Sequence, residues 1–163
     1  DQPRSRGLGD VYKRQPKELS DSATFDHRTA GAQKITNSGS TLTGAKLIQL
    51  DAKLRKHNSP AASPTIDAKI WDGGGTVKYT SPTHIDPTTL SASFGYVTFD
   101  FSTNTYSLQV NDRVGVEYTG TSSSNYVEFA YASDIVSNSI QNQIESGSWE
   151  NQSTRDFSAK FYK

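Results

Sequence analysis

The chain has 163 residues, among which 17 basic residues balance 17 acidic ones, and it contains no cysteine. Balanced charge excludes the basic field with which proteins collect nucleic-acid phosphates, and the absence of cysteine excludes disulfides and thiolate metal sites. No apolar run approaches the length of a transmembrane helix. We therefore expect neither a nucleic-acid partner nor a membrane span.

The N-terminal segment resembles the translation of a sequencing adapter rather than of a natural gene. Residues 5–15, with the sequence SRGLGDVYKRQ, translate back without a mismatch into a stretch that resembles a transposase-based sequencing adapter. Because such an adapter marks the end of a sequenced fragment, we expect residues 1–15 to be non-native and the natural N-terminus, with any signal peptide, to be missing. The expected domain spans residues 16–163, with its core at about 24–162.

From residue 44 onward, apolar and polar residues alternate with the period of two that is typical of half-buried strands. The first half of the domain predicts strands over residues 46–57, 65–72, 77–79 and 94–101. A polar stretch with two prolines separates the first two strands, and an Asp-Gly-Gly-Gly turn follows the second. The side chains expected to face the core are Ile48, Leu50, Ala52, Leu54, Ile66, Ala68, Ile70, Val77, Tyr79, Val97, Phe99 and Phe101.

The second half of the domain continues the same alternation. Further strands are predicted over residues 113–119, 125–133 and 156–162, whereas residues 134–154 are polar and ambiguous. The expected inward residues are Val114, Val116, Tyr118, Val127, Phe129, Tyr131, Phe157, Ala159 and Phe161. About seven or eight short strands without any helical period predict an all-β fold, a single-domain antiparallel β-sandwich of jelly-roll type. An α/β fold would need crossover helices, which the pattern lacks.

The order of these segments carries a family resemblance. The residues behind it are Leu42–Leu47, Ala68–Asp72, Val97–Phe101, Asn111–Tyr118, Ser124–Val127 and Ser148–Trp149 with Arg155–Tyr162. In this order the chain resembles the jelly-roll modules of large secreted microbial proteins, which are related in shape to galactose-binding-like and carbohydrate-binding domains. The resemblance implies an extracellular or cell-surface location and a non-catalytic module that works beside other domains of a longer chain.

Outward aromatic and acidic residues suggest a binding surface for sugars. Flat aromatic rings can stack on the apolar faces of sugar rings, while carboxylates bind the hydroxyl groups. The expected ligand-binding residues are Trp71, Tyr96, Glu117, Tyr126 and Glu128, and Trp149 is expected to be a lid of the core. The first hypothesis is therefore a carbohydrate-binding or adhesive module with a polysaccharide or glycoconjugate as partner. The alternative is a structural spacer of a surface or virion-fibre protein.

A third hypothesis is a glycoside hydrolase that uses Glu117 and Glu128. These residues lie on consecutive predicted strands, and if the strands form a hairpin, the two Cβ atoms lie about 5 Å apart. Such a separation is near that of the carboxylates of retaining glycosidases. The chain has no Gly-x-Ser-x-Gly or His-Glu-x-x-His motif and no Glu-x-Asp-x-x-Glu pattern. We therefore expect the protein not to be an enzyme.

A structural calcium ion is the one cofactor that the residue types suggest. Calcium takes carboxylate and carbonyl oxygens as ligands, and jelly-roll modules often hold such an ion. The candidate ligands are Asp26, Asp72, Asp134 and Asp156. They are candidates by residue type alone, since the chain has no Asp-x-Asp-x-Asp run.

Overall fold

The structure, a computed structural model, describes residues 29–120, 124–132, 139–145, 147–153 and 155–163. The segment 1–15 that is expected to be non-native lies outside these residues, as do Asp26 and Asp134. Over the described residues the chain forms strands and one short 3-10 helix, η1 (Pro87–Thr89). The strands are β1 (Ala30–Ile35), β2 (Gln49–His57), β3 (Ile66–Trp71), β4 (Val77–Ile85), β5 (Gly95–Asp100), β6 (Arg113–Glu117), β7 (Tyr126–Phe129), β8 (Tyr131–Ala132), β9 (Ser139–Glu145), β10 (Ser148–Gln152), β11 (Asp156–Phe157) and β12 (Ala159–Tyr162).

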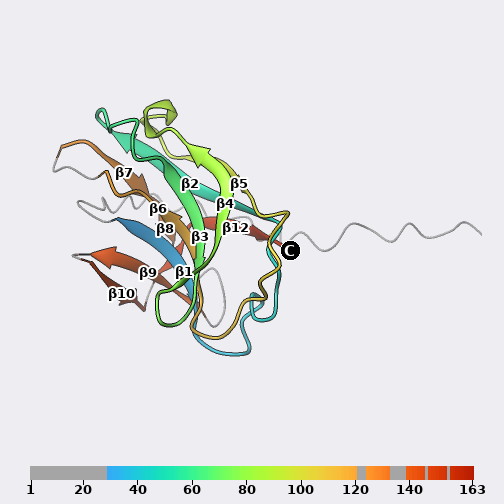
Figure 1. The fold of residues 1–163 in the computed structure, drawn as a ribbon. Helices are drawn as coiled ribbons and strands as arrows, with labels where there is room; N and C mark the ends of the chain where they lie inside the picture. The colour runs from blue at the N-terminus through green and yellow to red at the C-terminus, as the bar shows by residue number, and fades with distance from the viewer. Residues whose placement is uncertain (1–28, 121–123, 133–138, 146, 154) are drawn as a thin grey trace, which may run out of the picture.

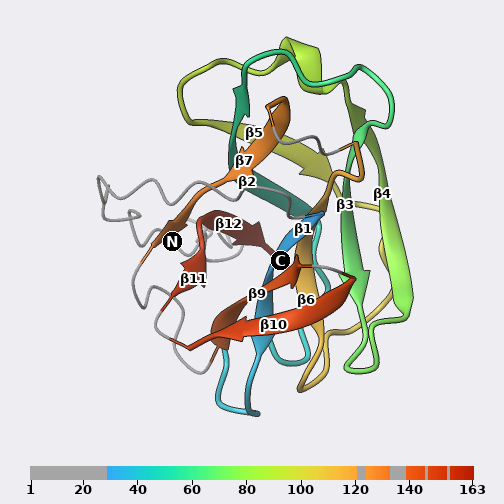
Figure 2. The same ribbon diagram turned by 90° about the vertical axis from the view of Figure 1, so that its left-hand side faces the viewer.

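The strands form two main antiparallel sheets that pack face to face (Figures 1 and 2). The first sheet has six strands in the order β10-β9-β1-β6-β3-β4. The second has four strands, with β12, β2 and β5 side by side and β7 also paired with β2, while β8 and β11 form a short separate ladder. The predicted all-β antiparallel sandwich is thus confirmed. None of the described residues belongs to a helix of the length and hydrophobicity that a membrane span requires.

Inward residues of both sheets meet in one hydrophobic core, largely as the alternation predicts. Its fully buried members include Leu50, Leu54, Ile66, Ile70, Phe99, Phe101, Val114, Val116, Tyr118, Phe129 and Phe157. Ile48 and Val77 are wrong predictions, because Ile48 is 51% exposed and Val77 is 45% exposed, while Leu47 next to Ile48 is buried. Leu47 and Leu50 both point inward, so the alternation slips by one residue just before β2 begins.

The central strand β1 was not predicted from the sequence. It lies between β9 and β6 and carries small residues, which have low strand propensity. The small residues are needed for packing: a Cβ added at Gly31 would lie 3.2 Å from Cγ of Phe129. In the ambiguous region 134–154, residues 134–138, 146 and 154 lie outside the described residues, while β9 and β10 pair as a hairpin with Gly147 at φ 85°.

Asp112 holds the connection between β5 and β6 in place. Its Oδ2 accepts hydrogen bonds from the hydroxyl of Tyr106 (2.9 Å) and from the backbone N–H of Gln109 (2.7 Å). Burial, followed by the hydrogen bond to Asp112, raises the pKa of Tyr106 from 10.0 to about 12. The folded state therefore favours the neutral phenol.

This shift predicts a loss of stability at alkaline pH. Because the folded-state pKa lies above the unfolded one, the contribution of Tyr106 is complete below about pH 10 and is lost as pH rises towards about 12. We expect the free energy of urea unfolding to fall across this range, and to fall less steeply in Tyr106→Phe. Equal slopes in the two proteins would contradict the role of Tyr106.

Candidate functional site

Trp71 lies on the outer face of the six-stranded sheet but is only 2% exposed. Trp149 of β10 covers it, with the two ring centroids 5.1 Å apart and the planes at 73°. The Arg113 guanidinium in turn lies 5.0 Å from the Trp149 ring centroid. Trp71 therefore points outward as predicted but is not available as a ligand-binding surface, because the β9–β10 hairpin brings another ring over it. Trp149 itself covers this outer face rather than the core between the sheets.

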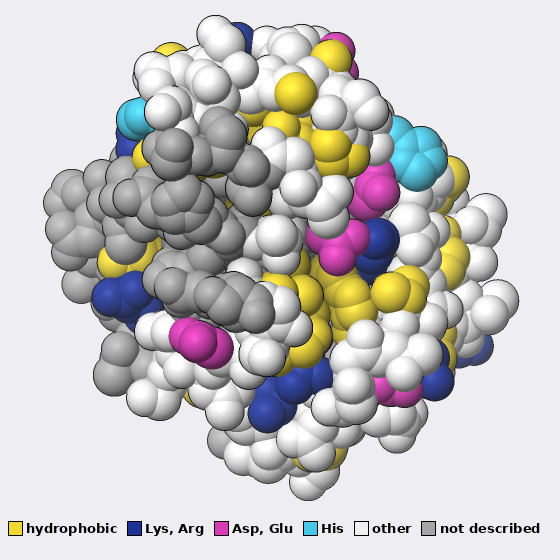
Figure 3. All heavy atoms as spheres, turned by 60° about the vertical axis from the view of Figure 1, so that its left-hand side comes forward, with side chains coloured by type: hydrophobic (Ala, Val, Ile, Leu, Met, Phe, Trp, Pro, Cys, Tyr) yellow, Lys and Arg dark blue, Asp and Glu magenta, His cyan; other side chains and the backbone are white. Residues whose placement is uncertain are grey.

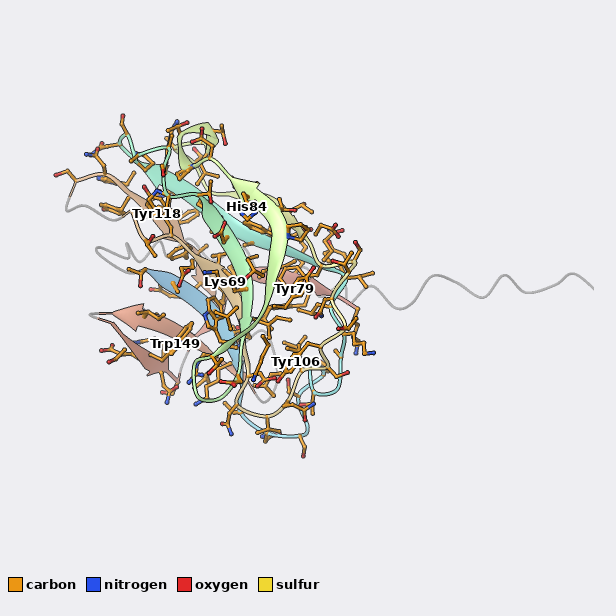
Figure 4. All side chains as sticks on the ribbon, viewed as in Figure 1. Lys69, Tyr79, His84, Tyr106, Tyr118 and Trp149 are labelled. Atoms are coloured by element: carbon orange, nitrogen blue, oxygen red, sulfur yellow. The ribbon has the colours of Figure 1, made fainter. Side chains whose placement is uncertain are left out.

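Glu117 lies on the same outer face and is already paired. Its carboxylate forms an ion pair with Lys69 on the neighbouring strand β3. Beside it, Asp67 lies 2.8 Å from Nδ1 of His84 on β4. Figure 3 shows hydrophobic side chains at the centre of this face with acidic and basic side chains next to them, and Figure 4 labels Lys69, His84 and Trp149. The charges of this region are thus largely neutralised within the protein.

The other three predicted ligand residues lie together on the outer face of the four-stranded sheet. The antiparallel register places Tyr96 beside Lys53, Glu128 beside Arg55, and Tyr126 beside His57. We call this surface the β2 face, because its middle row comes from β2. Its residues are Gln49, Asp51, Lys53, Arg55, His57, Phe94, Tyr96, Thr98, Asp100, Tyr126, Glu128, Lys160 and Tyr162.

One end of the β2 face is open to solvent, and Tyr96 is its exposed ring. Tyr96 is 37% exposed, and its predicted outward orientation is confirmed. The ammonium group of Lys160 lies 4.2 Å from the ring centroid and that of Lys53 lies 5.9 Å from it. An aromatic ring flanked by two cations on paired strands gives this end a defined shape and charge.

Asp51 organises the polar groups at this open end. Its buried carboxylate accepts hydrogen bonds from Nε2 of Gln49 (2.8 Å), Oγ1 of Thr98 (2.8 Å) and the hydroxyl of Tyr162 (2.9 Å). Burial, with the hydrogen bond to Asp51, raises the pKa of Tyr162. The predicted site residues did not include Asp51, Lys53 and Lys160. The alternation did predict that Asp51 and Lys53 point outward from their strand.

The other end of the β2 face is closed. Glu128 is 0% exposed and forms an ion pair with Arg55, whose guanidinium lies 4.5 Å from the Phe94 ring centroid. Tyr126 is also buried, because it stacks on His57 with ring centroids 4.4 Å apart. Tyr126 and Glu128 therefore point away from the core as predicted, but the expectation that Glu128 is solvated is wrong, because neighbouring side chains cover both residues.

Glu117 and Glu128 do not face each other. Strand β6, which carries Glu117, belongs to the six-stranded sheet, whereas β7, which carries Glu128, pairs with β2 in the other sheet. The chain crosses between the sheets after β6 instead of turning back as a hairpin. The predicted hairpin, and with it the carboxylate spacing proposed for a glycosidase, is wrong.

The two described calcium candidates have structural partners. Asp72 shapes the β3–β4 turn by accepting hydrogen bonds from the N–H groups of Gly74 and Thr76, both at 2.9 Å, and from Lys78. The hydrogen bond from Lys78, followed by that from Thr76, lowers the pKa of Asp72. Asp156 is buried and accepts a hydrogen bond from Gln33. Over the residues that the structure describes, no three His, Cys, Asp or Glu side chains gather where they could hold a metal ion.

Comparisons with protein-family models, with curated proteins and with solved structures find no match to the chain. The surface chemistry of the two sheets is thus the basis for assigning a function.

Proposed function

We propose that the protein is a jelly-roll module of a secreted or cell-surface protein that binds carbohydrate at the open end of the β2 face. The observation that carries the proposal is the exposed ring of Tyr96, held on a strand and bordered by polar side chains. Ligand sites generally combine apolar surface with a few fixed polar groups, and sites on strands are held more precisely than sites on loops.

The polar groups around Tyr96 suit a ligand rich in hydroxyl groups. Thr98 and Tyr162 are held in place by their hydrogen bonds to Asp51. A sugar ring that packs against Tyr96 would find amide, hydroxyl and ammonium groups within the same surface. Because β2 and β5 form a continuous ladder here, these groups need little rearrangement to meet a ligand.

Removal of the Tyr96 ring should weaken carbohydrate binding. We expect Tyr96→Ala to reduce affinity for a polysaccharide by about tenfold, equivalent to about 1.4 kcal/mol, because the stacking surface is lost. Tyr96→Phe keeps the ring and should bind nearly as well as the original protein. A glycan array identifies the ligand, and titration calorimetry with and without calcium measures the affinity.

A matched control distinguishes the effect of losing the Tyr96 ring from the effect of losing any exposed apolar group. Val77, on β4 of the other sheet, is 45% exposed, so Val77→Ala removes an exposed apolar group away from the site and should leave affinity unchanged. Equal affinities for Tyr96→Ala and the original protein would remove Tyr96 from the site. Failure of the original protein to bind any polysaccharide would refute the proposed function.

The second candidate function is that of a structural spacer between other domains of a longer chain. It is supported by the internal pairing of charges on both outer faces, such as Lys69 with Glu117 and Arg55 with Glu128. A surface whose charges are already paired has less to offer a ligand. A protein that binds no glycan and whose complete gene encodes tandem copies would favour the spacer.

A further inference from the structure

The open end of the β2 face carries two lysines that form no ion pair with any described residue. Lys53 and Lys160 both direct their ammonium groups towards the Tyr96 ring. They come from paired strands, since Lys53 lies on β2 and Lys160 lies on β12, where it is opposite Asp51 of β2. Two positive charges are therefore gathered at one aromatic ring.

The buried carboxylate of Asp51 lies on the same face as the two lysines, but none of the ion pairs among the described residues joins it to either of them. Asp51 accepts its hydrogen bonds from three uncharged groups, those of Gln49, Thr98 and Tyr162. Two lysines of the six-stranded sheet, by contrast, do have acidic partners: Lys69 pairs with Glu117 and Lys78 with Asp72. Lys53 and Lys160 thus differ from Lys69 and Lys78 in that their ammonium groups lie at an aromatic ring and form no ion pair with a described carboxylate.

An aromatic ring is a weaker partner for an ammonium group than an anion is. The attraction to the ring quadrupole at an exposed site is smaller than that of a charge-assisted hydrogen bond to an anionic oxygen. Lysine side chains are long and flexible, so the two ammonium groups can turn from the ring to an arriving anion. The same movement would uncover the face of Tyr96 for a sugar ring.

We propose that the open end of the β2 face selects anionic polysaccharides, with a carboxylate or sulfate group of the polymer bound between Lys53 and Lys160 and its sugar ring on Tyr96. This inference rests on the proposed carbohydrate-binding function and specifies its substrate class. It also requires that binding weaken with salt, because Lys53 and Lys160 are only partly buried and salt screens the attraction between charges near the surface.

The test uses the full chain and three polymers that share one backbone: dextran, carboxymethyl-dextran and dextran sulfate. We expect both charged polymers to bind at least about tenfold more tightly than dextran, and their ranking separates the carboxylate from the sulfate. Raising NaCl from about 0.05 M to about 0.5 M should weaken the charged complexes and leave any dextran complex unchanged.

Variants connect this selectivity to the two lysines. The double substitution Lys53→Gln and Lys160→Gln should lower affinity for the charged polymers by about tenfold or more, because both positive charges are lost. Lys53→Arg with Lys160→Arg keeps the charges and should keep the binding. Lys78→Gln, on β4 of the other sheet, is the matched control and should bind as the original protein does. Circular dichroism and thermal unfolding of each variant verify the fold.

The possible results discriminate between the two proposals. Equal binding of dextran and the charged polymers, with loss in Tyr96→Ala, overturns the anionic selectivity and retains the carbohydrate-binding function. Charged-polymer binding that persists in the Lys53→Gln, Lys160→Gln protein also overturns the selectivity at this site. Binding to none of the three polymers, nor to any glycan of the array, overturns both proposals.

Discussion

Gly115→Ala is expected to destabilise the protein by about 3 kcal/mol or more, as overpacking at a site with no room for a side chain does at its upper range. Gly115 lies in the middle of β6, between β1 and β3. A Cβ at this position would lie 2.6 Å from Cβ of Ala32 and closer still to the backbone of Gly31 and Ala32. The obstructing atoms belong largely to the backbone of a central strand, so relief would require β1 and β6 to separate.

Gly95→Ala is the matched control, because it makes the same change in another strand. Nothing lies within 4 Å of a Cβ added at Gly95. Alanine also restricts the unfolded chain more than glycine does, so this variant should be neutral or more stable by up to about 1 kcal/mol. Urea unfolding of both variants measures the difference. A loss for Gly115→Ala that is no larger than the change for Gly95→Ala would mean that β1 and β6 are not in such close contact.

Arg55→Met is expected to cost about 3 kcal/mol, because it leaves the fully buried carboxylate of Glu128 without its ion-pair partner. The Oε1 atom of Glu128 is buried and has no hydrogen-bond partner, and His57 lies 3.9 Å away from it. The Arg55 guanidinium is therefore the main source of compensation for this charge. Thermal or urea unfolding at neutral pH measures the loss.

Two further variants show whether the buried charge causes the loss. Glu128→Gln in the Arg55→Met background removes the uncompensated charge and should recover part of the stability. Removing one partner of a buried ion pair costs more than replacing both partners with uncharged groups. Lys78→Met breaks a more exposed pair with Asp72 and should change stability far less than Arg55→Met does. If the double variant is no more stable than Arg55→Met, lost packing of the Arg55 side chain is responsible instead.

The alternation of apolar and polar residues was sufficient to predict most core strands. In β2, β3, β5 and β6 most residues predicted to point inward, such as Leu50, Ile70, Phe99 and Val116, are fully buried, and Val97 is partly buried. This succeeds because successive side chains of a strand point to opposite sides, so one strand reveals its own buried side. The outward orientation of Tyr96 follows from the same rule.

The tertiary structure alone decided which strands are neighbours and what covers their outer sides. Trp71, Tyr126 and Glu128 all point away from the core as predicted, yet they are buried by Trp149, His57 and Arg55, which come from other strands. The pairing of β7 with β2, which separates Glu128 from Glu117, likewise joins segments far apart in the chain. The period of a strand is a local property of its residues, whereas pairing and coverage depend on the free energy of the whole packed chain. The sequence therefore determined the all-β class and the inward and outward sides of its main strands, and the fold decided that Tyr96 is the aromatic ring of the predicted site that stays exposed.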